Sequence, residues 1–338
     1  MSGGGGDMQV RTITAGGARV VPVEALPTAL AEVRADPTRL LWVDLPVCDQ
    51  AAVDVLVDVF GFAPTAIQEC IDRQRMPKVH AYPDHLFVVL HSPERGERGH
   101  VHYVELDQFI ADRVLVTVHG PTNPAVPVDL PVRDTDEVWS QVQAGALRPT
   151  SAMALSHAIA SAVAEHMEAM IEQVTADVWS LEQQVTAGAI GDPETFLDEM
   201  FRTRHALLAV GNVSGNGYEV YERMLTLATQ LPDRDRALVA DSLEEIRGIH
   251  RLAVGQREYL QGVIEFYRTR TDTKMAIAAE RLAVIAVVTL PITALASVLG
   301  MNVIVNATTQ YHWLGIALVV MIAMSLYLLR WAKRHGWW

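Results

Sequence analysis

The 338-residue sequence predicts an α/β domain with a mixed, partly antiparallel sheet, then a long helical stalk and two C-terminal transmembrane helices. Strand-like apolar runs occur through the first third of the chain, and residues 151–302 keep an apolar pattern at helical spacing with few breaks. No Asp, Glu, Lys or Arg occurs from residue 282 to residue 329, which is typical of membrane-spanning segments.

The glycine-rich residues 1–15 are predicted to be a flexible tail, in which either Met1 or Met8 could be the natural start. This tail has no apolar segment of the kind that a secretory signal needs. Residues 16–133 then alternate strand and helix patterns and form the predicted α/β domain, with strands expected at 39–45, 78–82, 85–91, 102–110 and 113–119 and helices at 50–60 and 64–71. The last four strands follow one another through short turns, so we expect them to pair as antiparallel hairpins.

Residues 134–281 are predicted to form the helical stalk region. A first long helix spans residues 151–188, and Asp192 and Pro193 have the N-cap and N1 residue types that begin a second helix. A third helical pattern runs from residue 233 to residue 302, which at about 1.5 Å per residue is roughly 100 Å. Because it begins polar and ends apolar, it is expected to be a stalk that enters a membrane.

Residues 282–301 and 313–329 are the two predicted transmembrane helices, joined by an outer loop at 302–312 and followed by a basic tail at 330–338. Positive charge is found on both outer flanks and not in the loop: Arg268, Arg270, Lys274 and Arg281 precede the first helix, and Arg330, Lys333 and Arg334 follow the second. By the positive-inside rule, both termini and the soluble domain are expected in the cytoplasm.

The composition restricts the functional classes. A net charge of −13 argues against a nucleic-acid partner, which would need Lys and Arg clusters. It suits cations, although many soluble domains are acidic for solubility alone. Two cysteines are too few for a disulfide framework and indicate a reducing compartment. Phosphate-binding glycine loops, nucleophile elbows and HExxH motifs are missing from the sequence, so no enzyme and no cofactor is expected.

One face of the first transmembrane helix is small or polar nearly throughout: Asp272, Ala276, Ala279, Ala283, Ala286, Leu290, Thr293, Ser297 and Gly300. Two helices cannot enclose a pore, so such a face could line one only if several copies surround an axis. Small residues also mark close helix packing in lipid, and the pattern alone leaves both explanations open.

The tripeptide Gly300-Met301-Asn302 ends this helix, directly before the short outer loop. In that position it resembles the signature of CorA-type magnesium channels and of the related ZntB-type zinc transporters. The mid-helix Pro291, the basic C-terminus and the segments at 77–90 and 114–119 also resemble that family. The resemblance covers the chain from about residue 35 onward, and it implies a funnel-shaped homopentamer with the first transmembrane helix lining the pore.

Residue by residue, the resemblance implies an ion mouth and selectivity site at Gly300, Met301 and Asn302 and a polar ring at Thr293. It also implies a hydrophobic gate at Leu290 and Leu282, further pore lining at Ala286, Ala279 and Ala276, and acids at the cytoplasmic mouth at Asp272 or Glu265. The family's inner constriction usually has Asn and Met where this chain has Ala276 and Ala279. The loop at 303–310 lacks the acidic residues typical of the magnesium branch, which weakens the assignment of the ion.

The expected function is therefore a channel in the bacterial inner membrane that carries Mg²⁺, and also Co²⁺ or Ni²⁺, into the cytoplasm, with its own copies, the lipid bilayer and divalent cations as partners. A regulatory Mg²⁺ is a further expectation, for which Glu244-Glu245 and Asp233-x-Asp235 on the stalk offer carboxylates. The alternatives are a ZntB-like zinc transporter and a membrane-anchored helical scaffold without transport. His100-x-His102 places two imidazoles on one face of a strand, where a metal could bridge them, although exposed strand histidines are common without one.

Overall fold

The computed structural model describes residues 8–72, 74, 76–96, 99–121, 123–127, 129–227, 231–303 and 311–334, without the side chains of residues 299, 301–303 and 311–314. The described chain divides into two compact units, Met1–Gln261 and Gly262–Trp338. Helix α7 is continuous through the boundary between them.

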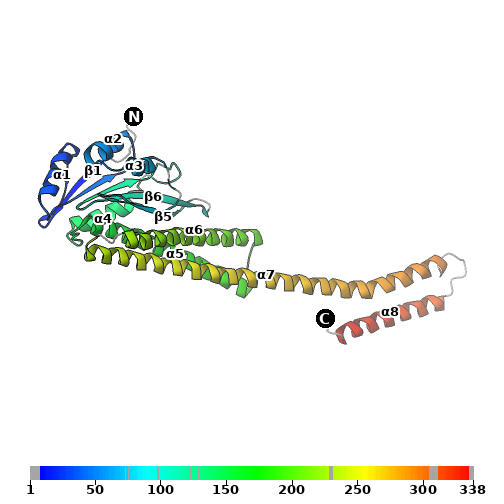
Figure 1. The fold of residues 1–338 in the computed structure, drawn as a ribbon. Helices are drawn as coiled ribbons and strands as arrows, with labels where there is room; N and C mark the ends of the chain where they lie inside the picture. The colour runs from blue at the N-terminus through cyan, green and yellow to red at the C-terminus, as the bar shows by residue number, and fades with distance from the viewer. Residues whose placement is uncertain are drawn as a thin grey trace. The chain divides into compact units, whose positions relative to one another are not determined.

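The first unit is built on a seven-stranded sheet with the strand order β2-β1-β3-β7-β6-β5-β4 (Figure 1). Its strands are β1 Gln9–Thr14, β2 Gly17–Val21, β3 Leu40–Leu45, β4 Lys78–Ala81, β5 Leu86–Arg95, β6 Val101–Ile110 and β7 Val114–His119. The central pair β3 and β7 is parallel, and the other neighbouring pairs are antiparallel. This arrangement confirms the predicted mixed sheet and the hairpins of the last four strands.

Helices cover both faces of this sheet. Figure 1 shows α1, α2 and α3 on one face and α4, α5, α6 and the beginning of α7 on the other. The helices are η1 Val23–Ala25, α1 Leu26–Ala35, α2 Gln50–Asp54 with its π-helical continuation η2 Val55–Phe60, α3 Pro64–Ile71, α4 Arg133–Gln143, α5 Ala152–Ala187, α6 Pro193–Leu227 and α7 Asp233–Val303. The first unit is therefore a three-layer α/β/α domain.

Strand β3 shows why the sheet sits between two cores. Successive side chains of a strand point to opposite faces. Leu41 and Val43 accordingly pack with α1 to α3, whereas Leu40 and Trp42 pack with α4 to α7. A strand that is covered on both faces has a continuous apolar sequence, and this is why the sequence pattern identified β3.

The long helices begin and end where the capping residues predict. Ser151 caps α5 by accepting a hydrogen bond from the backbone N–H of Ala154 at 3.1 Å, and Gly188 ends the helix with a left-handed φ of 73°. Asp192 accepts from the N–H of Thr195 at 3.0 Å, and Pro193 is the first residue of α6.

The predicted flexible tail of residues 1–15 is wrong for its second half. Residues 9–14 form β1, which pairs with β2 and β3, and α1 follows where no helix was expected. Strand β1 was missed because its central residue is Arg11, a poor candidate for a core position. Its guanidinium is nevertheless fully buried, beside Asp44 and over the ring of Trp42.

The second unit contains the rest of α7 and α8, Tyr311–Arg334. In the described chain, two segments are long and apolar enough to cross a membrane, one within Asp233–Val298 and the other Gly315–Arg334. Only 6% of the residues in their most apolar windows are buried. Such exposure in helices this apolar fits a lipid environment and not the core of a soluble domain.

Candidate functional site

The apolar part of α7 stays helical through Pro291, although proline removes one backbone donor. Two threonine hydroxyls near it donate back to the helix: Thr289 to the carbonyl of Ile285 at 2.9 Å and Thr293 to the carbonyl of Thr289 at 2.8 Å. Such side-chain bonds help satisfy backbone carbonyls in apolar surroundings. A continuous helix therefore positions all the predicted pore residues on one element.

The predicted pore-lining face is accessible in the single chain. Leu282 and Leu290 are each 67% exposed, Ala276, Ala279 and Thr293 are exposed, and Ala286 is half-buried. On the other side of the helix, Val284 is buried and Val288, Ile292 and Leu295 are half-buried. Ile285 and Val298, which lie outside this face, are also exposed at 58% and 62%, so the small and polar face is part of a wider surface of α7 that one chain leaves uncovered.

The Thr293 hydroxyl bonds back to its own helix. Its proton is donated to the carbonyl of Thr289, so the lone pairs of Oγ1 remain as acceptors. An acceptor-only oxygen suits a cation or the water around it. Thr293 therefore has the chemistry expected of a polar ring in a pore.

The predicted ion mouth lies in the last turn of α7, which ends at Val303. A Cβ built on Gly300 would meet nothing within 4 Å, so packing within the described chain does not require glycine there. The side chains of Met301 and Asn302 and the loop residues 304–310 lie outside the described residues. The last carbonyls of a helix have no partner within it and form the negative end of its dipole, and this end lies at the predicted mouth.

The two predicted acids of the cytoplasmic mouth, Glu265 and Asp272, are exposed on α7. They lie within the charged part of the helix that precedes the apolar segment. Asp272 is ten residues before Leu282, or about 15 Å along the axis. The structure thus places both acids before the proposed gate along the same helix.

A second group of possible metal ligands lies in the first unit. His157 of α5 and Asp241 and Glu245 of α7 each place one ligand atom within 4.8 Å of the others. His157 Nε2 is 3.5 Å from Asp241 Oδ2, and its Nδ1 is 2.8 Å from the Ser242 hydroxyl. We call these three residues the His157 cluster. An imidazole with two carboxylates is a donor set that suits Zn²⁺, Co²⁺ or Ni²⁺ better than Mg²⁺, which prefers oxygen ligands throughout.

The structure separates the stalk acids that the sequence grouped together. Glu245 belongs to the His157 cluster and accepts a 2.8 Å hydrogen bond from Ser161. Glu244 instead pairs with Arg247 on its own helix. Asp235 accepts from Ser151 at 2.7 Å, and Asp233 is fully exposed near Arg236. The spacing of Asp241 and Glu245 already indicates a shared helix face, but no sequence signal connects them to His157.

Comparison with known proteins decides the family. The family model described as "CorA-like Mg2+ transporter protein" matches residues 38–334. The chain belongs to the CorA-like Mg²⁺ transporter family. Its function class is therefore the membrane transport of divalent cations and not enzymatic catalysis, and the predicted family is confirmed.

Other relatives of this CorA-like chain agree with that assignment. It is 21% identical over 304 residues to a protein of Bacillus subtilis (strain 168) named "Putative metal ion transporter YfjQ", covering 88% of this chain and 89% of that protein. The structure of the complete CorA magnesium transporter from Methanocaldococcus jannaschii superposes with a TM-score of 0.76 at 14% identity, covering 98% of both chains. The similarity extends over the full length, which confirms the predicted α/β domain, long helix and two C-terminal apolar helices.

Two further structures show how widely this fold is shared. The full-length CmaX protein superposes with a TM-score of 0.74 at 15% identity, covering 96% of this chain and 97% of that one. The ZntB cytoplasmic domain from Vibrio parahaemolyticus RIMD 2210633 gives 0.61 at 10% identity, covering 79% and 98%. At such identities the likeness concerns the fold, so the transported ion must be argued from the residues of this CorA-like chain.

Proposed function

We propose that this chain forms a homopentameric channel in the bacterial inner membrane that conducts Mg²⁺ into the cytoplasm through a pore lined by α7. The observation that carries the proposal is the small and polar face of α7, which is accessible in the single chain and leads to Gly300-Met301-Asn302. One chain contributes two apolar helices, too few to enclose a pore, so several copies must share one axis. A scaffold without transport would have no need of such a face ending in an amide side chain.

The proposed mouth favours magnesium for a physical reason. Mg²⁺ gives up its water ligands reluctantly and prefers octahedral oxygen coordination. A ring of Asn302 amide oxygens, supported by the carboxyl-terminal dipole of each helix, would bind the hydrated ion through its waters and avoid the free energy of dehydration. Gly300 allows close approach of the backbone to the axis.

The proposed gate consists of Leu290 and Leu282. Apolar rings offer water no hydrogen bonds, so a narrow leucine constriction excludes water and ions by dewetting. Ala276 and Ala279, which are small, would leave the constriction to these two positions. Below the gate, Asp272 and Glu265 would supply negative charge to cations that arrive at the cytoplasmic end.

A regulatory divalent cation is proposed at the His157 cluster, which brings α5 and the beginning of α7 together. Its three ligand atoms lie close enough for one ion, and Ser161 orients Glu245 toward it. Because the cluster includes an imidazole, it would respond to Zn²⁺, Co²⁺ or Ni²⁺ more strongly than to Mg²⁺. Bound Mg²⁺ there would have to be coordinated mainly by the two carboxylates and water.

Zinc transport is the second candidate, and one observation favours it. The loop residues 303–310 contain no Asp or Glu that would attract a strongly hydrated cation. Cation flux into proteoliposomes of the purified chain distinguishes the two functions, with Mg²⁺, Co²⁺, Ni²⁺ and Zn²⁺ compared at equal concentration. Fastest flux of Mg²⁺ supports the leading proposal, fastest flux of Zn²⁺ supports the alternative, and no flux of any of them contradicts both.

The same liposomes test the mouth. We expect Asn302→Ala to abolish selective flux while the oligomer and its thermal stability are retained. The matched control is Asn306→Ala, which removes the same amide four residues further on, in the predicted loop. If Asn302→Ala conducts as the wild type does at equal protein density, Asn302 is not the selectivity residue.

A further inference from the structure

Three histidines converge at one edge of the first unit, from two different elements. His100 directly precedes β6, His102 is the second residue of β6, and His205 lies on α6. The ring centroids of His100 and His102 are 5.0 Å apart, and those of His100 and His205 are 6.3 Å apart. His100 is exposed and the other two are half-buried, so water and ions can reach the group.

These two separations are close to those between imidazoles that share one metal ion. With a Zn–N bond of about 2.0 Å and tetrahedral angles, the centroids of two ligand rings lie about 5 Å apart. One observed separation has this value and the other exceeds it by little more than 1 Å. The rings now pack on each other, edge to face and face to face, and their nitrogens do not converge on one point, so binding requires the side chains to rotate.

The backbone at this edge is arranged to hold the rings close. A Cβ on Gly96 would lie 2.4 Å from Nε2 of His102, so the glycine leaves the space that this ring occupies. A Cβ on Gly99 would lie 2.4 Å from Cγ of Arg202, which is on α6 three residues before His205. Gly96 therefore makes room for the His102 ring, and Gly99 lets the β5–β6 hairpin approach α6, the helix that carries the third histidine.

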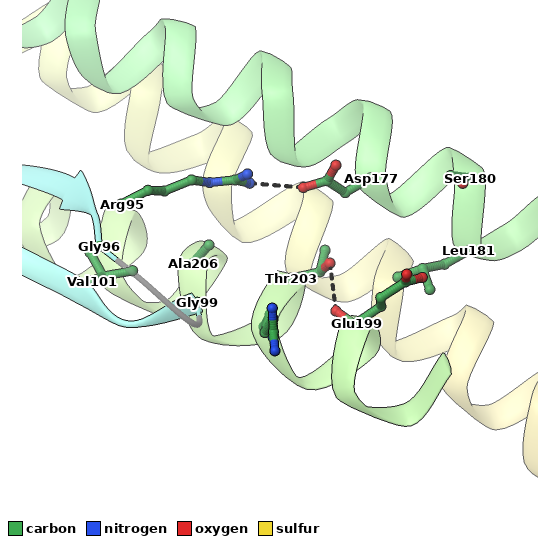
Figure 2. Close-up of a pocket in the computed structure, with 11 residues that line it drawn as sticks. Arg95, Gly96, Gly99, Val101, Asp177, Ser180, Leu181, Glu199, Thr203 and Ala206 are labelled. Carbon is green, nitrogen blue, oxygen red and sulfur yellow. Dashed lines mark hydrogen bonds and ion pairs between the residues drawn. The ribbon is translucent and has the colours of Figure 1, made fainter. Parts of the chain in front are cut away.

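The hairpin is also fixed to the neighbouring helix α5. Arg95 of β5 forms a 2.9 Å ion pair with Asp177 of α5 (Figure 2). Both residues line a cavity of about 490 Å³, together with Gly96 and Gly99. The Gly96 N–H donates to the His100 carbonyl at 2.7 Å and holds the two ends of the hairpin together. Arg202 of α6 is likewise paired, with Asp198 at 2.5 Å. Because both arginines have a carboxylate partner, their charge opposes the binding of a cation only weakly.

We propose that His100, His102 and His205 form a binding site for one Zn²⁺, Co²⁺ or Ni²⁺ ion, with water at the remaining coordination position. Imidazole nitrogens are good ligands for these metals, whereas Mg²⁺ requires oxygen. The ion would join the β5–β6 hairpin to α6. This site lies in the first unit, does not include the pore residues or the His157 cluster, and does not depend on which ion the chain transports.

Binding is measured on the purified full-length chain in detergent, by competing Zn²⁺ against a chromogenic chelator in the presence of millimolar Mg²⁺. We expect two zinc equivalents per chain, one at this site and one at the His157 cluster. His205→Gln and His102→Gln should each weaken one equivalent by at least about tenfold, since even residues that only support a metal ligand contribute that much. The matched control His157→Gln should weaken the other equivalent and leave this one unchanged.

Two further readouts separate a built site from weak binding to surface histidines. Co²⁺ bound by three imidazoles and water should give a visible d–d absorption that His205→Gln removes and His157→Gln retains. Zinc should raise the thermal unfolding midpoint of His157→Gln but not that of the double variant His157→Gln/His205→Gln. If His205→Gln and His102→Gln bind zinc as the wild type does, or if all histidine variants lose affinity by the same small factor, the site does not exist.

Discussion

At the scale of single residues, the most demanding feature is a charged group inside the first unit. Arg11 is fully buried, with its guanidinium 4.4 Å from the ring centroid of Trp42 and 3.4 Å from the carboxylate of Asp44. His119 Nε2 lies 2.9 Å from the same carboxylate. Burial alone would raise the pKa of Asp44, but the neighbouring His119 and Arg11 lower it below its usual value. The buried charges therefore stabilise one another and fix β1 against β3 and β7.

Removing one partner of this buried group should be costly. We expect Asp44→Asn to lower the free energy of unfolding by about 3–5 kcal/mol, because it leaves Arg11 buried without a full counter-charge. Asp136→Asn is the matched control: Asp136 is 3.0 Å from the same guanidinium but its side chain is 54% exposed, so its loss should cost less than about 1 kcal/mol. Thermal or urea unfolding of the full chain in detergent, followed by tryptophan fluorescence, compares them. Equal losses would show that Asp44 has no special role.

Asp107 shows the opposite behaviour and makes stability depend on pH. It is buried on β6, and burial raises its pKa well above the usual value, with a further increase from the charge of Glu105. The folded chain therefore holds this proton more tightly than the unfolded chain, whose Asp titrates near about 3.9. The contribution of protonated Asp107 to the free energy of unfolding is complete below that pH and is lost as the pH rises through the folded pKa. The total loss is about 1.4 kcal/mol for each pH unit that separates the folded and unfolded pKa values.

Asp107→Asn should remove this dependence. We expect the variant to gain stability relative to the wild type as the pH is raised from 4 to 8, because it has no carboxyl to ionise in the core. Asp112→Asn is the control, since the side chain of Asp112 is 85% exposed. Unfolding midpoints measured across this pH range test the idea, and a difference between variant and wild type that does not change with pH would contradict it.

At the scale of elements, the gate is a property of one face of α7. Leu290→Ser and Leu282→Ser place a polar hydroxyl in the proposed constriction and should wet it, so resting Mg²⁺ flux should rise even at high internal Mg²⁺. Leu290→Ala widens the ring but keeps it apolar, so its effect should be smaller. Leu318→Ser on α8, where Leu318 is 52% exposed, is the control for a serine elsewhere in the apolar helices. If both serine variants close as tightly as the wild type, closure lies outside this helix face.

The elements also show what the sequence can predict. The breaks at Gly188 and Pro193 and the continuous β3 run are local signals, and β3, α5 and the start of α6 were predicted close to their observed bounds, whereas α1 and α4 were not predicted. Strand β1 was not, because the burial of Arg11 depends on Asp44 and Trp42, which belong to β3. The His157 cluster and the contact of His100 with His205 were missed for the same reason: each needs the helices to be placed on the sheet.

At the scale of the whole molecule, charge and hydropathy separate along the chain. The acidic residues all precede residue 282, the Lys and Arg residues either precede residue 282 or follow residue 329, and residues 282–329 carry neither. The two apolar helices are bordered on their outer ends by Arg281 and Arg330. Because cytoplasmic flanks of membrane helices carry the excess of Lys and Arg, this distribution predicts one orientation in the bilayer, with the acidic first unit in the cytoplasm.

That orientation can be tested by cysteine labelling in intact cells. The half-buried Cys48 is first replaced by serine. The fully buried Cys70 is replaced by alanine, which puts no polar hydroxyl into the core. Asn306→Cys in the predicted outer loop should then react with a membrane-impermeant maleimide added outside. Gly336→Cys near the C-terminus should react only after the membrane is opened by detergent, because the basic flank at Arg330, Lys333 and Arg334 favours the cytoplasmic side. Labelling of Gly336→Cys from outside in intact cells, with Asn306→Cys protected, would reverse the topology and would place the proposed Asn302 mouth on the cytoplasmic face, where it could not select incoming ions.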